Sequence, residues 1–143
     1  MRFHMTKPLR LTALTGAASL AATAGLVGTA TSASAAERDG VCEAAEFCLY
    51  FTQGFGEPLF DLFVDDADFG DDFFPGEPSL PVNDNTRSYS NQDTFVWRVF
   101  DEPNFAGEEL LCAAPGEMGD LPVDAWDRAS SASLSNDPCV VSP

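Results

Sequence analysis

Histidine and lysine are almost absent from this chain of 143 residues. The one histidine is His4 and the one lysine is Lys7, and neither residue type occurs after them. This absence excludes Ser-His-Asp and Cys-His catalysis, hydrolytic zinc sites with histidine ligands, and lysine Schiff bases or phosphate clamps. Carboxylate pairs remain, but a chain with 23 acidic residues contains such pairs by chance. We therefore predict that the protein is not an enzyme.

Positive charge is equally scarce. After residue 36 the chain has four basic side chains against all 23 acidic ones, which leaves a net charge of −19. The four are Arg38, Arg87, Arg98 and Arg128. Nucleic acids and anionic membranes need positive charge on the protein, so we exclude both as partners. The acidic surface favours either simple solubility or a basic or metal-bearing partner attracted by the field.

Long apolar runs are also missing, apart from one near the N-terminus. Residues 11–27 are almost wholly Leu, Ala, Gly, Thr and Val, three basic residues precede them, and small residues follow at 33–35. This order is typical of a secretory signal peptide, and the run is short for a membrane span and lacks a positive flank. We predict a signal peptide at 1–35, cleavage after residue 35 or 36, and a secreted, extracellular domain at 36–143. No cysteine lies at the cleavage point, so we expect no lipid anchor and no membrane contact after cleavage.

Four cysteines follow the predicted cleavage point. They are Cys42, Cys48, Cys112 and Cys139. Export places them in an oxidising compartment, where two disulfides are expected and three pairings are possible. We favour Cys42 with Cys48 and Cys112 with Cys139, because each bridge then stays inside one of the two units described below. The longer loop gives its bridge about 3 to 4 kcal/mol in the chain-entropy model.

The chain leaves no room for long helices. Gly and Pro recur at short intervals from Gly54 to Pro122, which excludes a helix of three turns over most of this region. Residues 47–51 and 95–100 are rich in aromatic and β-branched side chains and predict strands. Residues 123–129 predict a single helical turn before a Ser-rich strand at 129–134. The sequence therefore predicts an all-β fold, a sandwich or barrel of Greek keys.

A short aromatic pattern occurs twice, fifty positions apart. A second shared element follows each copy, at residues 83–88 and 126–131. These two elements lie seven residues closer together than the two aromatic patterns do. The chain is therefore interpreted as two related units, at about 42–92 and 93–139, of which the first gained an acidic run at 61–77. The repeated residues are Tyr50, Phe55 and Ser88 in the first unit, and Phe100, Phe105, Gly107 and Ser131 in the second.

These repeated residues resemble the Greek-key motif of the βγ-crystallin fold. In that motif two aromatics and a glycine form a folded hairpin, and a distant serine hydrogen-bonds back to it. The resemblance implies a βγ-crystallin-like Greek-key sandwich of two related units with two disulfides. Glu57 stands where the first unit should have its glycine. We expect Gly56 to let that hairpin bend one residue early.

The spacing from Cys42 to Cys48-Leu49-Tyr50, the two units and the signal peptide together resemble secreted actinobacterial peptidase inhibitors. This resemblance implies a non-enzymatic inhibitor or binder of an extracellular metallopeptidase of the thermolysin type. We expect the protein to be a monomer. The matching inhibitory loop is Cys112, Ala113, Ala114 and Pro115. In such inhibitors a nearby cysteine closes the loop, whereas here Glu117 cannot close the ring. We expect Cys139 to stiffen the loop from a distance.

The same fold implies a calcium site as the alternative function, in a structural or cell-envelope module. The candidate ligands are Asn83, Asp84, Ser88, Asp127 and Ser130. Oxygen ligands of this kind suit a hard cation. Arg87 replaces one hydroxyl ligand and Trp126 replaces a leading Asn or Asp, so we expect a remaining site around Asp127 and Ser130.

The acidic run at 61–77 also contains several phenylalanines. An EF-hand register from Asp66 to Glu77 fails, because Gly70 and Asp71 occupy the wrong places. Four interpretations stay open: the run is a solvated loop, the phenylalanines cap the core of the first unit, they form a partner-binding face, or the carboxylates bind calcium weakly.

Overall fold

The computed structural model describes residues 38–140. The predicted signal peptide and its cleavage point lie outside the described residues. Within 38–140, no helix has the length and apolar character that a membrane crossing needs. The strands are β1 (Phe47–Tyr50), β2 (Leu59–Leu62), β3 (Ser88–Asn91), β4 (Val96–Glu102), β5 (Ala106–Ala113), β6 (Met118–Asp120) and β7 (Ser131–Ser135). Short 3₁₀ turns lie at η1 (Gln53–Phe55), η2 (Phe69–Asp71), η3 (Pro103–Phe105) and η4 (Val123–Ala125).

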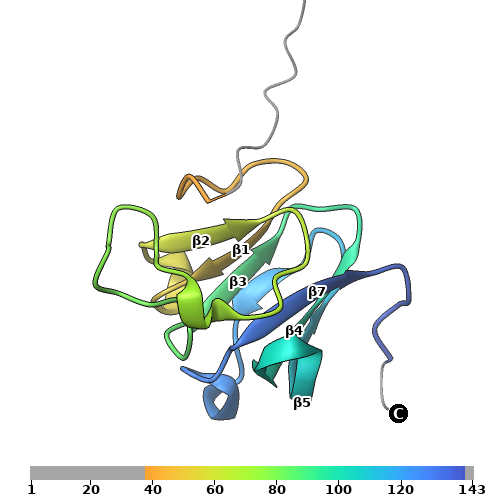
Figure 1. The fold of residues 1–143 in the computed structure, drawn as a ribbon. Coiled ribbons are helices and arrows are strands. Elements are labelled where there is room, and N and C mark those ends of the chain that lie inside the picture. The colour runs from red at the N-terminus through yellow and green to blue at the C-terminus, as the bar shows by residue number, and fades with distance from the viewer. Residues whose placement is uncertain (1–37, 141–143) are drawn as a thin grey trace, which may run out of the picture. The chain divides into compact units, whose positions relative to one another are not determined.

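The described strands form two antiparallel sheets, and the all-β prediction is confirmed (Figure 1). The first sheet has the order β2-β1-β3-β6 and the second the order β5-β4-β7. β6 therefore belongs to the second unit in sequence but pairs with β3 of the first. In return, Asp66 of the first unit pairs with Ala132 in β7, through backbone hydrogen bonds of 2.8 and 2.9 Å. Each sheet thus contains a segment from the other unit.

One core fills the space between these sheets. Trp97 from β4 stacks on Phe47 from β1 with ring centroids 5.0 Å apart, and both side chains are fully buried. Burying a large apolar side chain of this kind contributes about 1.5 to 3 kcal/mol. The aromatic-rich strands of the two units therefore meet each other, which explains why each unit carries one.

The acidic run contributes to the core and is not a plain surface loop. Phe69 and Phe74 are buried, and Phe69 contacts Phe60 edge to face at 5.8 Å. These three side chains fit the interpretation of a cap on the core. Phe63 and Phe73 stay exposed. The run also begins inside β2, so part of it is strand.

Three carboxylates of this run are buried and bind the N-terminal strap, residues 38–42. Asp61 accepts the backbone N–H groups of Asp39 and Gly40. Arg38 forms ion pairs with both Asp66 and Asp72. Arg38 also lies over the ring of Phe60, 5.3 Å from its centroid. A disulfide between Cys42 and Cys48 fixes the other end of the strap.

The repeated serines connect distant parts of each unit. The Ser131 hydroxyl accepts the N–H of Phe105 at 3.1 Å and donates to the carbonyl of Glu102 at 2.7 Å. In the first unit, the Ser88 hydroxyl makes the same pair of bonds, with Phe55 and Thr52. The hairpin between the first two strands of each unit is therefore held by one buried hydroxyl.

The bend of the first hairpin does not occur at Gly56, and that expectation is wrong. Gly56 is extended, with φ −78° and ψ 132°. Gly54 and Phe55 take the positive φ instead, just as Asn104 and Phe105 do in the second unit. A Cβ atom at Gly56 would lie 1.8 Å from the hydroxyl of Thr52, so this glycine serves close packing.

Replacing Ser131 with Ala should destabilise the fold by about 1 to 3 kcal/mol, because it removes both hydrogen bonds of a buried hydroxyl, to the N–H of Phe105 and to the carbonyl of Glu102. Urea denaturation measures the change. Ser133→Ala is the matched control, since Ser133 lies on the same strand and has a partly exposed side chain. An equal decrease in the free energy of unfolding for both variants would contradict this role of Ser131.

Stability should also fall as the pH rises. Burial raises the pKa of Asp72 from 3.8 to about 7, the hydrogen bond and charge of Asp66 and the charge of Asp71 add to the rise, and Arg38 opposes it. Between these pH values the folded protein holds a proton that the unfolded chain has lost, so the free energy of unfolding decreases from about pH 4 to about pH 7. Asp72→Asn should reduce this decrease, as measured by denaturation across that range. The exposed control Asp137→Asn should keep it, and an unchanged pH dependence in Asp72→Asn would refute the assignment.

Candidate functional site

The expected inhibitory loop begins inside a strand. Cys112 and Ala113 are the last residues of β5, where they pair with Arg98 and Trp97. Ala113 is fully buried. Ala114 is partly buried, and residues 115–118 are exposed. Another protein can therefore reach residues 115–118, which lie a few residues after the expected bond that follows Cys112.

Residues 114–117 form a tight turn, which we call the 114–117 turn. The N–H of Glu117 donates to the carbonyl of Ala114 at 3.0 Å. Pro115 has a fixed φ, and Gly116 has φ +77°, a combination typical of a type II turn. A residue with a side chain would be strained at position 116.

Glu117 closes this turn without a covalent bond. One carboxylate oxygen accepts the N–H of Ala114 at 2.8 Å, and the other accepts the hydroxyl of Tyr89 at 3.0 Å. Burial, followed by the hydrogen bond to Glu117, raises the pKa of Tyr89 to about 12. The phenol therefore stays a donor at neutral pH. Sequence reasoning considered Glu117 only as a residue that cannot form a disulfide ring, and it did not predict that the Glu117 carboxylate closes the turn by a hydrogen bond.

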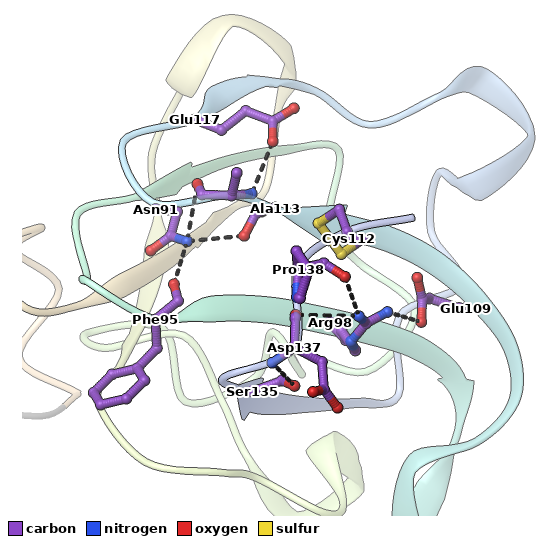
Figure 2. The surroundings of a disulfide bond; sticks show 12 residues. Asn91, Phe95, Arg98, Glu109, Cys112, Ala113, Glu117, Ser135, Asp137 and Pro138 are labelled. Atoms are coloured by element: carbon purple, nitrogen blue, oxygen red, sulfur yellow. Dashed lines mark hydrogen bonds and ion pairs between the residues drawn. A yellow bond between two sulfur atoms is a disulfide. The ribbon is translucent and has the colours of Figure 1, made fainter. Parts of the chain in front are cut away.

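Asn91, at the end of β3, lies beneath the turn. Its side-chain amide donates to the carbonyls of Phe95, Ala113 and Ala114, at 2.9, 3.0 and 3.1 Å (Figure 2). Its backbone N–H donates to the carbonyl of Glu117 at 2.8 Å. Sequence reasoning did not select Asn91, because a single asparagine at a strand end carries no recognisable signal.

A disulfide from Cys112 to Cys139 holds the strand that enters the turn, so both favoured disulfide pairings are confirmed. Arg98 reinforces this contact, since its guanidinium donates to the carbonyls of Asp137 and Pro138, at 3.4 and 3.1 Å (Figure 2). The C-terminal segment is therefore fixed to β4 and β5 beside the turn.

The two expected calcium-binding stretches lie side by side. Asp84 donates its backbone N–H to the carbonyl of Ala129 at 3.0 Å, and Asp127 donates likewise to Thr86 at 3.1 Å. Ser130 is nearly buried next to β7, and its backbone N–H donates to the carbonyl of Phe100. The fold thus brings together stretches that are about forty residues apart, as the resemblance implied.

The residues as they lie do not fit a calcium ion at Asp127. Arg87 donates to both carboxylate oxygens of Asp127, at 3.1 and 2.7 Å, and its guanidinium lies 5.5 Å from the ring centroid of Trp126. The Ser88 hydroxyl is already used in its hairpin. The Asn83 amide donates to the carboxylate of its neighbour Asp84. Within residues 38–140, no group of three or more Asp, Glu, Cys or His side chains is arranged to hold a metal.

The four arginines of residues 38–140 have partners within the protein. Besides Arg38 and Arg87, Arg98 pairs with Glu109 at 2.7 Å, and Arg128 pairs with Asp101 and Glu108 at 2.8 and 2.7 Å. Each of the four therefore has an acidic partner in the same chain, and the excess carboxylates are left to set the sign of the surface potential.

Solved structures with a similar fold include βγ-crystallins. One, described as "Evolution of the eye lens beta-gamma-crystallin domain fold", has 18% identity and a TM-score of 0.56, and the match covers 67% of this chain and 93% of that chain. This likeness confirms the expected βγ-crystallin fold. A second is a βγ-crystallin from Ciona intestinalis, with 23% identity, a TM-score of 0.48, and coverage of 63% of this chain and 99% of that one. The comparison with curated proteins found no match.

A family model gives the more specific result. The model of peptidase inhibitor family I36 matches residues 35–112, which is more than half of the chain. The match includes the first unit and the second as far as the cysteine that leads into the 114–117 turn. An inhibitor family also agrees with the non-enzymatic prediction made from the missing histidine and lysine. The chain therefore belongs to peptidase inhibitor family I36.

Proposed function

We propose that the protein inhibits an extracellular metallopeptidase by placing the 114–117 turn and Met118 in its active-site cleft. The observation that carries this proposal is an exposed turn, closed by hydrogen bonds, directly after a strand end fixed by a disulfide. Met118 is 53% exposed and offers an apolar side chain next to the turn. The segment is thus accessible and held in one conformation.

A fixed turn suits an inhibitor for an energetic reason. A flexible segment loses conformational entropy when a cleft orders it, at about 0.5 to 1.5 kcal/mol for each immobilised side chain. The 114–117 turn loses little of that freedom on binding, because it is already ordered. A larger share of the free energy of its contacts with the peptidase therefore contributes to the affinity of binding.

Charge supports a partner with a positive cleft. The chain is strongly acidic after residue 36, and the four arginines in that part are bound to carboxylates of the same chain. An acidic inhibitor is attracted to a cleft that contains a metal cation or basic side chains, which raises the rate of association. Together with the resemblance to inhibitors of thermolysin-type peptidases, this argument favours a zinc endopeptidase of that type as the target.

The two disulfides support an extracellular site of action. Such bridges form and persist in oxidising compartments, and the inhibitor family agrees with this location. We infer that the protein is exported through the predicted signal peptide and acts as a monomer.

We also infer that the fold does not depend on calcium. The guanidinium of Arg87 takes the position of a cation at Asp127, and it links a residue of the first unit to one of the second. A calcium ion at Asp127 would have to displace this ion pair. The alternative function as a calcium-stabilised module is therefore less well supported than inhibition.

The inhibition proposal is tested with the protein purified after export and a thermolysin-type zinc endopeptidase. We expect inhibition at micromolar concentrations, and an at least tenfold loss of potency in Met118→Asp, because the charge would enter an apolar contact. Val123→Asp is the matched control, since Val123 is also exposed and lies outside the turn. Undiminished peptidase activity with an excess of the wild-type protein would refute the proposal.

Calcium independence is tested by thermal melting with calcium and with chelator. We expect the same melting temperature for the wild-type protein, whereas a bound ligand at a hundred times its Kd would add about 2.7 kcal/mol. In Arg87→Ser the guanidinium is replaced by the hydroxyl that the calcium pattern requires, so we expect calcium to raise the melting temperature. Arg98→Ser serves as control, because it removes an ion pair elsewhere. A calcium-dependent melt of the wild-type protein would overturn this inference.

A further inference from the structure

We propose that Asn91 is the positioning residue of the 114–117 turn, and that Asn91 and Glu117 together replace the covalent ring implied by the family resemblance. This inference rests on the proposed function in one respect, that the turn is the part that meets the peptidase. It assigns the turn's rigidity to particular residues, none of which is a cysteine.

The topology places Asn91 at this point. β5 belongs to the second sheet and β6 to the first, so the 114–117 turn is the crossing between the sheets. β6 pairs with β3, with Met118 opposite Ser90. The end of β3 therefore lies against the end of the turn, and Asn91 is the last residue of β3.

Asn91 contacts the turn through both its side chain and its main chain. The amide nitrogen donates to the carbonyls of Ala113 and Ala114, where the chain leaves β5. The backbone carbonyl of Asn91 accepts the N–H of Gly116 at 2.9 Å, and its backbone N–H donates to the carbonyl of Glu117 at 2.8 Å. One residue therefore bonds to both arms of the turn. The ring of Pro115, between the arms, needs no such bond to fix its φ.

Asn91 is itself held by the core. It is fully buried, and its side-chain oxygen accepts the N–H of Asp93 at 3.0 Å. The carboxylate of Asp93 in turn accepts the indole N–H of Trp97 at 3.0 Å. Trp97 is the core residue that stacks on Phe47. The turn is thus connected to the centre of the core through two side chains, and a buried polar network with satisfied partners is rigid.

Glu117 supplies the second restraint from the exposed side. Its carboxylate bonds to the N–H of Ala114 across the turn and to the hydroxyl of Tyr89 on β3. The bond to Ala114 closes residues 114–117, an interval that lies within the one a disulfide ring starting at Cys112 would span. The restraint by Asn91 and the restraint by Glu117 therefore act on the same four residues.

This arrangement determines how a peptidase treats the turn. Hydrolysis requires the peptide to enter the cleft extended and to adapt to the catalytic groups, whereas a turn held at both arms resists that adaptation. The restrained turn should behave as an inhibitor. A loosened turn with the same residues should be hydrolysed as a substrate.

Amide hydrogen exchange of the isolated protein tests the restraint without any peptidase. In the wild-type protein we expect the N–H groups of Gly116 and Glu117 to exchange as slowly as those of β4, because they bond to Asn91 and Ala114. In Glu117→Ala we expect the N–H of Ala114 to exchange at least tenfold faster. Glu77→Ala is the matched control, since it removes one exposed acidic side chain from another turn. Exchange at the rate of an unprotected loop in the wild-type protein would overturn the proposal.

The second experiment follows cleavage between residues 113 and 118 by mass spectrometry during incubation with the thermolysin-type endopeptidase. We expect at least tenfold faster cleavage in Glu117→Ala and in Asn91→Ala than in the wild-type protein, each scored only on folded material. If Asn91→Ala does not fold, the cleavage rate of Glu117→Ala and the exchange rates of the wild-type protein still test whether the turn is restrained. Equal cleavage of Glu117→Ala and wild type refutes the restraint as the cause of resistance.

These measurements separate the two proposals. Slow exchange in the turn without any inhibition would refute the proposed function and support the positioning role of Asn91. Inhibition by a protein whose turn amides exchange freely would support the function and refute the positioning role. If Asn91→Ala lowers the melting temperature but changes neither the exchange rates of the turn amides nor the cleavage rate of the turn, Asn91 has only a structural role and the proposal is refuted.

Discussion

The exchange of segments between the two sheets is the constraint on which the rest of this structure depends. β6 belongs to the second unit in sequence but pairs with β3 of the first unit. Asp66 belongs to the first unit but pairs with β7 of the second. Neither unit can complete its sheet alone, so both share one core, in which Trp97 stacks on Phe47. Because sequentially distant segments must meet, the fold needs strong restraints at its crossings. Buried serines, two disulfides and paired arginines supply them.

The same exchange gives the chain its candidate functional surface. A chain that passes from one sheet to the other has to reverse over a few residues, and the 114–117 turn does this between β5 and β6. Its exposure follows from its place at the edge of both sheets, and its order follows from Asn91 beneath it. An exposed yet ordered turn is what an inhibitor requires. Inhibition thus needs no addition to the fold beyond a crossing that the fold already contains.

Much of the fold was predictable because it depends on local chemistry. The missing long helices and the aromatic strands were foreseen from residue type and spacing, and the favoured pairing of the cysteines from the two-unit plan. The role of the repeated serines was foreseen from the resemblance to the βγ-crystallin motif. The bend of the first hairpin was not foreseen, because Gly56 turned out to make room for Thr52 and not to supply a positive φ. The burial of Asp61 and Asp72 was also missed, since an acidic residue is buried only when a distant donor is present to meet it.

The sequence by itself determined the all-β class, the two-unit plan and the exclusion of histidine- and lysine-based catalysis, because composition and short repeats are sufficient for these conclusions. Only the tertiary structure decided which segment of the inhibitory loop is exposed, and that Arg87 occupies the side of Asp127 where a cation was expected. It alone revealed Asn91, whose partners Ala113 and Ala114 lie more than twenty residues away along the chain. Contacts of that kind depend on how strands cross between sheets, and no local pattern in the sequence encodes that crossing.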